Sequence, residues 1–121
     1  MVQLLGHDDL GVRWEATQAL KTKVDGSFDT QLKALLQDVD LRKRGLAAYI
    51  AVHRWKNDSF GIMKSLLADE SQLVRFDAIS ALIMEGGLAG RKVALAHAAH
   101  EPNATLKKLI EAAADPAEHR Q

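Results

Sequence analysis

Pairs of leucines, each followed by a polar turn and an alanine-lined segment, recur along the chain with one constant spacing. Leu-Leu pairs begin at positions 4, 35 and 66, arginines stand at 13, 44 and 75, and alanines stand at 16, 47 and 78, so each feature returns after 31 residues. Internal similarity with a period of about 20–50 residues is typical of stacked-repeat proteins. The pattern therefore predicts a helix, a short turn and a second helix in each period.

The spacing of apolar residues within a period predicts where its helices lie. In the third period the stripe of Ile62, Leu66 and Leu67 predicts a first helix, and the apolar positions of 73–84 predict a second, which Gly86 ends. The same patterns predict a helix after the polar turn at 7–9, a helix with the stripe Leu32, Leu35 and Leu36, and further helices over 41–55, 88–100 and 104–114.

The repeats predict one domain over residues 1–121, divided at about 1–25, 26–56, 57–87 and 88–115, with a polar tail at 116–121. The first repeat lacks most of its first helix, which leaves a fragment of a longer array possible, and Leu106 stands where the period places an arginine. Because no repeat can bury its leucines alone, stacking must build the core. We expect an all-α, right-handed solenoid of about four helix pairs. A four-helix bundle is the alternative, although it gives no reason for arginines in phase.

Composition narrows the classes of partner. The chain has 16 basic and 16 acidic residues, so its net charge of zero argues against a general electrostatic grip on nucleic acid or on an anionic membrane. Without cysteine it has no disulfide and no thiolate metal site, and a reducing compartment is permitted. Neither a secretory signal nor a stretch of about 20 apolar residues is evident. We therefore expect a cytoplasmic protein with no membrane partner. The sequence makes no prediction of its oligomeric state.

The repeated pattern, Leu-Leu, acidic turn, Val-Arg-x-x-Ala and x-x-Ala-Leu, resembles the short HEAT-like repeats first associated with phycobilisome lyases. Residues 66–82 match best and residues 4–20 nearly as well, whereas the second copy has Lys43 in place of the valine. The resemblance covers almost the whole chain. It implies a HEAT-like fold but little about function, because these repeats serve many roles.

The resemblance also implies an acidic residue six positions before the arginine, as found before Arg44 and Arg75. His7 takes this place before Arg13. We expect these residues to clip each turn to its second helix and to join adjacent repeats, and the alternative is a column of arginines that grips a phosphate or carboxylate ligand. The predicted structural clips are Arg13, Asp38, Arg44, Asp69 and Arg75.

In HEAT-like stacks the second helices tend to line a concave face, so the residues between their buried positions are expected to point outward. Aromatic and Met side chains near an arginine are enriched at protein interfaces. An alternative is that some of these residues, Trp14 and Tyr49 above all, pack inward. The predicted protein-binding residues are Trp14, Glu15, Gln18, Arg42, Tyr49, His53, Phe76, Asp77, Ser80 and Met84.

No catalytic or metal chemistry is evident. His97 and His100 share a helix face beside Glu101, but a third ligand is lacking, so surface histidines are the preferred interpretation. There is no phosphate-binding glycine loop and no activated serine. The sequence therefore predicts a non-catalytic adaptor, scaffold or regulatory subunit, without cofactor or metal, that binds a protein or peptide on its concave face. The alternatives are an accessory subunit of an enzyme or lyase complex and, less favoured, a nucleic-acid binder.

Overall fold

The computed structural model describes residues 2–23 and 26–114, and every regular element within them is helical, which confirms the all-α prediction. The elements are two 3-10 helices, η1 (Val2–Gly6) and η2 (Lys56–Ser59), and the α-helices α1 (Leu10–Lys21), α2 (Phe28–Leu35), α3 (Leu41–Trp55), α4 (Phe60–Leu67), α5 (Gln72–Glu85), α6 (Gly87–Ala98) and α7 (Ala104–Ala114). No helix among the described residues is both long and apolar enough to span a bilayer.

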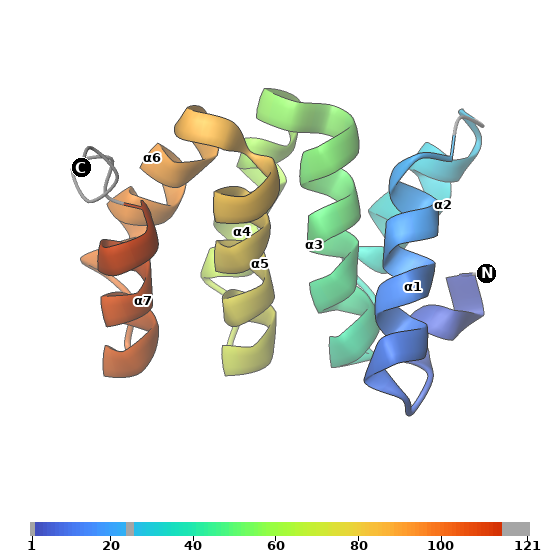
Figure 1. Cartoon of the computed structure of the whole chain (residues 1–121), viewed down its shortest axis with the longest axis horizontal. Helices are drawn as coiled ribbons and strands as arrows, with labels where there is room; N and C mark the ends of the chain where they lie inside the picture. Colours follow the sequence, from blue (N-terminus) through green and yellow to red (C-terminus); the bar gives the residue numbers. More distant parts are fainter. Residues whose placement is uncertain (1, 24–25, 115–121) are drawn as a thin grey trace.

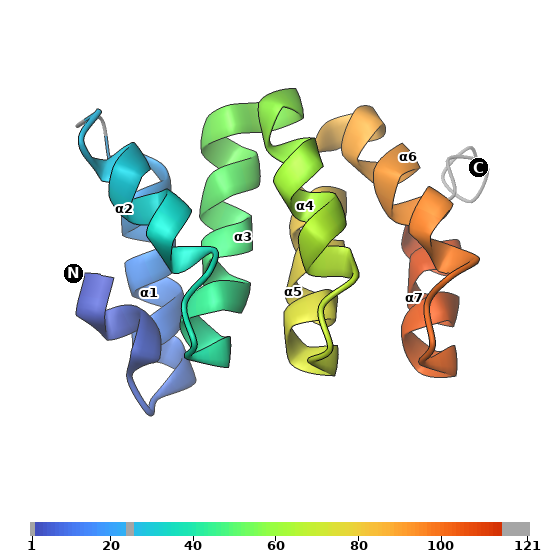
Figure 2. The ribbon, with the colours of Figure 1, turned by 180° about the vertical axis from the view of Figure 1, so that it is seen from behind.

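The helices form two layers. Helices α1, α3, α5 and α7 stand side by side in one layer (Figure 1), and α2, α4 and α6 form the other, which faces the reader in Figure 2. The chain progresses from η1 and α1 at one end to α7 at the other. Each turn between the layers brings the chain back beside the preceding helix pair, so contacts between neighbouring pairs build the structure.

Side-chain caps fix where the helices of the first layer begin. Asp9, Asp40 and Ser71 each accept a hydrogen bond from a backbone N–H in the first turn of α1, α3 and α5, at 3.2, 2.9 and 3.3 Å. Asn103 does the same at the start of α7, at 3.0 Å. Such caps satisfy backbone donors that have no partner within the helix. The caps follow the 31-residue period up to Ser71, whereas Asn103 comes after 32 residues.

This extra residue corrects the predicted phase of the fourth repeat. The backbone N–H of Lys107 bonds to Asn103 just as that of Arg75 bonds to Ser71, so Lys107, not Leu106, occupies the position equivalent to the arginines. Leu106 is buried at 5% exposure and takes the place of the buried Val74. A prediction from a fixed period misses an insertion in a turn. Here the hydrogen bonds of the cap at Asn103 show that one residue has been inserted.

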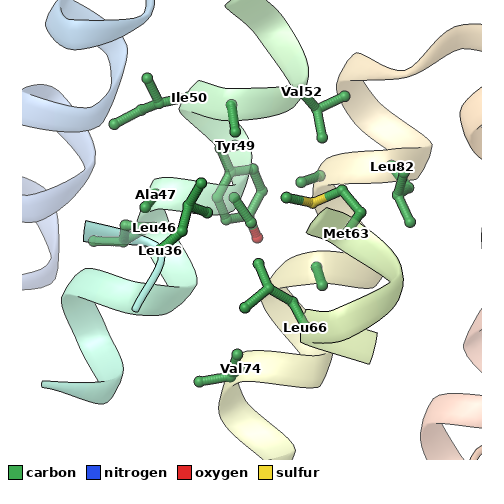
Figure 3. Packing of buried hydrophobic residues seen from close by; sticks show 14 of the residues in the cluster. Leu36, Leu46, Ala47, Tyr49, Ile50, Val52, Met63, Leu66, Val74 and Leu82 are labelled. Carbon is green, nitrogen blue, oxygen red and sulfur yellow. The ribbon is translucent and has the colours of Figure 1, made fainter. Parts of the chain in front are cut away.

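Helix α3 is the centre of the core. All its residues from Gly45 to Val52 are buried, and its alanines allow the close approach of α1 on one side and α5 on the other. Figure 3 shows the side chains of α3 meeting Leu36 beside α2 and Met63 and Leu66 of α4. The burial of this apolar surface is the main favourable contribution to folding.

Helix α6 approaches α5 so closely that only a glycine fits at position 90 of the contact. A β-carbon on Gly90 would overlap the backbone carbonyl oxygen of Leu82, and Gly87 adopts a φ of +62°, a conformation that L side chains rarely adopt. The predicted end of the preceding helix at Gly86 agrees with the structure, in which Gly86 is the C-cap of α5.

Candidate functional site

The ten residues predicted to bind a protein lie on α1, α3 and α5, adjacent helices of one layer (Figure 1). Their side chains differ in accessibility. Glu15, Gln18, Phe76 and Met84 are exposed, Trp14, Arg42, His53 and Ser80 are half-buried, and Tyr49 and Asp77 are buried. The exposed fractions are 39% for Phe76 and 60% for Met84, against 5% for Tyr49 and 8% for Asp77.

The burial of Tyr49 and Asp77 differs from the expectation that both point outward. The hydroxyl of Tyr49 donates a hydrogen bond to Oδ1 of Asp77 at 3.1 Å, and the ring of Trp14 meets that of Tyr49 edge to face, with centroids 5.1 Å apart. Gly45 makes room for the carboxyl of Asp77 on the surface of α3. These contacts link α1, α3 and α5 through packing between the helices, and Trp14 covers the pair on the α1 side.

Burial determines the acid–base properties of this pair. It raises the pKa of Asp77 from 3.8 to about 6, although the hydrogen bond from Tyr49 and the charge of Arg13 oppose the shift. Burial, together with the charge of Asp77, also raises the pKa of Tyr49 well above its usual range, so the hydroxyl remains a donor at neutral pH.

A second polar cluster on the same layer was not anticipated from the sequence. Nζ of the buried Lys21 lies 2.6 Å from Oε2 of Glu85 and 3.1 Å from the side-chain oxygen of Gln18. Nδ1 of His53 lies 2.9 Å from Oε1 of Glu85. Burial alone would raise the pKa of Glu85, but the hydrogen bonds from Lys21 and His53 outweigh it and hold that pKa below its usual value. Because Lys21 and Glu85 are 64 residues apart, no local pattern signals their pairing.

The arginines in phase make two kinds of contact. Nη1 of Arg13, Arg44 and Arg75 donates to the backbone carbonyl oxygen six positions earlier, at 2.7, 2.7 and 2.9 Å. The predicted acidic side chain at that position is therefore not the acceptor within the repeat. The carboxylate of Asp38 instead accepts from the N–H of Asp40 at 2.8 Å, which tightens the turn.

The carboxylates that pair with Arg44 and Arg75 belong to the next repeat, whereas Arg13 bonds to the backbone carbonyls of His7 and Asp8. Arg44 donates to both carboxylate oxygens of Asp69, with Nε–Oδ2 and Nη2–Oδ1 distances of 3.0 and 3.1 Å. Nε of Arg75 lies 3.1 Å from Oε1 of Glu101, whose side chain is fully buried. This geometry satisfies the guanidinium groups of Arg44 and Arg75 from within the chain, and so it does not favour a column of arginines that binds a ligand.

The histidine pair belongs to the same network. Nε2 of His97 lies 2.9 Å from Oε1 of Glu101, whereas His100 is exposed. Burial would raise the pKa of Glu101, but the hydrogen bonds from His97, from the N–H of Asn103 and from Arg75 hold it below its usual value. Within residues 2–23 and 26–114 no three His, Asp or Glu side chains are arranged to hold a metal ion.

The surface formed by α1, α3 and α5 therefore has exposed apolar side chains beside fixed polar groups. Phe76 and Met84 are exposed on α5, the helix that also carries Asp77 and Glu85 into the two buried clusters. These clusters bond α5 to α3 and α1, so the exposed side chains stand on a rigid support. Comparisons of the chain with protein-family models, with curated proteins and with solved structures found no match.

Proposed function

We propose that this chain is a right-handed α-solenoid of HEAT-like repeats and serves as a non-catalytic adaptor or regulatory subunit that binds a protein or peptide. Two layers of helices, repeated caps and Arg-to-carboxylate pairs between successive repeats support the solenoid. In this proposal α1, α3, α5 and α7 line the concave face.

The pairing of Lys21 with Glu85 supports a layer of α1, α3, α5 and α7 that curves to form the proposed concave face. It joins α1 to α5 across the intervening α3. With neighbouring axes about 8–10 Å apart, the axes of α1 and α5 in a flat layer would lie about 16–20 Å apart. A Lys and a Glu side chain meet more readily across that span if the layer curves toward the side on which they lie.

One observation carries the binding proposal: Phe76 and Met84 are exposed, large and apolar on a helix that buried polar contacts hold in place. A helix that is already held in place needs no ordering of its backbone on binding, and Phe and Met are enriched at the centres of interfaces. Glu15, Gln18 and Arg42 then form a polar rim. Trp14 contributes to this face indirectly, because its ring packs on the buried Tyr49.

The test compares two ways of removing exposed apolar surface. Proteins captured by the wild-type chain are identified, purified and titrated by calorimetry against Phe76→Ala/Met84→Ala and against Val39→Ala. Val39 is a matched control, because it is 93% exposed and lies in the turn before α3. We expect the double variant to weaken binding by about tenfold or more, and Val39→Ala to change it less than about twofold, with the helical circular dichroism of both unchanged.

Trp14→Ala is a less direct probe, since loss of its contact with Tyr49 also lowers stability. The proposal fails if every captured protein binds the double variant as tightly as the wild type. It fails equally if Val39→Ala weakens binding as much, because the effect would then reflect exposed apolar surface in general.

A further inference from the structure

A groove of about 410 Å³ lies between α4 and α6, in the layer opposite the proposed concave face, and it is open to solvent. Figure 2 shows these two helices side by side in the layer nearest the reader. Leu67 of α4 and Val93 and Ala96 of α6 contribute its apolar walls. A groove of this size is within the range of ligand sites, which are mostly apolar with a few convergent polar groups.

The groove arises where the repeat pattern fails. Four inward positions recur in this layer. They are Phe28, Leu32 and Leu35 of α2 with Leu36 after it, then Ser59 of η2 with Met63, Leu66 and Leu67 of α4, and then Gly90, Ala94, His97 and Ala98 of α6. The small residues of α6 allow it to lie directly against the backbone of α5 at Leu82. The side chains of Val93, Ala96 and His97 on α6 then line the space beside Leu67 without filling it.

The turn after α6 departs from the pattern at the same place. With its one additional residue, Glu101 takes over the role of Asp69, accepting from the arginine of the preceding repeat and from the N–H two residues later. His100 is left exposed at the groove. Departures from a local rule that cluster at one place are expected at functional sites.

Two exposed lysines line the groove, one from each helix. Lys64 projects from α4 and Lys92 from α6, both are exposed, and neither forms an ion pair within the described part of the chain. No carboxylate lines the groove itself. The nearby carboxylates already have partners within the chain, since Glu101 bonds to His97 and Arg75, and Asp69 bonds to Arg44. Lys64 stands in the last turn of α4, where a cation offsets the helix dipole, but Lys92 lies in the middle of α6 and has no such role. An anionic ligand would supply the ion-pair partner that Lys64 and Lys92 lack among the described residues.

We propose that this groove binds an acidic peptide segment of another protein, which places an apolar side chain against Leu67 and Val93 and carboxylates beside Lys64 and Lys92. The groove is open to solvent and would leave a small molecule largely exposed. This shape therefore favours an extended or helical peptide segment as the ligand. The apolar walls distinguish this site from a general cationic surface. The site is separate from the face of α1, α3 and α5 and does not depend on it.

The test selects displayed random short peptides against the full chain. We expect the enriched peptides to be acidic and to share an apolar residue, and to lose affinity by about tenfold or more for Lys64→Glu/Lys92→Glu. Lys107→Glu/Lys108→Glu is the matched control, because it reverses the same number of exposed charges on α7. This control should change affinity less than about threefold, and amide shifts on binding should fall in α4 and α6.

Several outcomes overturn the proposal. They are failure to enrich any peptide, enrichment of neutral or basic peptides, and equal effects of the two double charge reversals. Peptides that lose affinity for Phe76→Ala/Met84→Ala and not for Lys64→Glu/Lys92→Glu would also overturn it while supporting the concave face. Peptides with the opposite sensitivity would support the groove even if the concave face proves inactive. Circular dichroism of each variant checks that the helices remain folded.

Discussion

The carboxyl group of Asp77 on α5 lies against Gly45 on α3 so closely that the glycine has no room for a β-carbon. The carboxyl also accepts the hydrogen bond of Tyr49, one turn further along α3. A glycine in the middle of a helix costs about 1 kcal/mol relative to alanine. Its presence at position 45 therefore indicates that contact between α3 and α5 outweighs helix propensity there.

We predict that Gly45→Ala lowers the free energy of unfolding by about 1–3 kcal/mol, because Asp77 must move and its contact with Tyr49 is disturbed. The matched control is Gly61→Ala on α4, where an added β-carbon meets nothing within 4 Å. This control should stabilise the protein by about 0.5–1 kcal/mol. Urea unfolding of both variants measures the difference. Stabilisation by Gly45→Ala would contradict the packing described for α3 and α5.

The pKa of Asp77, about 6, predicts a pH dependence of opposite sign to that of an ordinary carboxylate. Because this pKa is raised above its unfolded value of 3.8, the contribution of Asp77 to stability is complete below pH 3.8 and is lost as the pH rises through about 6. The loss amounts to at most about 3 kcal/mol. Asp77→Asn keeps an acceptor for Tyr49 and cannot ionise, so stability relative to this variant should fall between about pH 4 and pH 7 in chemical denaturation. A constant difference would contradict the shift.

Glu85, on the same helix, should show the reverse dependence. Lys21 and His53 hold the pKa of Glu85 below its unfolded value of 4.5. Its contribution is therefore present above pH 4.5 and is lost as the pH falls through the folded pKa. We predict that Glu85→Gln costs about 1–3 kcal/mol at pH 7, because it leaves the buried ammonium of Lys21 without its charged partner. The cost should shrink below pH 4, as measured by urea unfolding, and a cost independent of pH would assign the loss to packing.

Arg75 and Glu101 should behave as a buried, coupled pair. Arg75→Leu leaves the fully buried carboxylate of Glu101 with His97 as its remaining side-chain partner, so we predict a loss of about 3 kcal/mol. Arg44→Leu should cost less, since the side chains of Arg44 and Asp69 retain exposures of 18% and 16%. A double-mutant cycle of Arg75→Leu with Glu101→Gln, measured in urea, should show a cost smaller than the sum of the single changes. Additive costs would mean that the two groups act independently.

The spacing of residues in the sequence determined the main α-helices and the phase of the arginines in the first three repeats. Local periodicity shows which side chains share a helix face, and the polar turns that precede α1, α3 and α5 hold the residues that cap these helices, Asp9, Asp40 and Ser71. The resemblance to HEAT-like repeats gave the expectation that Arg44 and Arg75 join neighbouring repeats, but it did not indicate their backbone acceptors.

Tertiary structure decided which of these faces became interior. Tyr49 and Asp77 occupy positions that the repeat assigns to the surface, but Gly45 lets their helices meet closely enough to bury them. The contact between Lys21 and Glu85 and the groove between α4 and α6 depend on how neighbouring helices are spaced, to which every side chain at the interface contributes. A linear pattern specifies which residues share a face of each helix. The distance between helices is determined only when the layers pack, and that distance decides which side chains are buried and where a groove stays open.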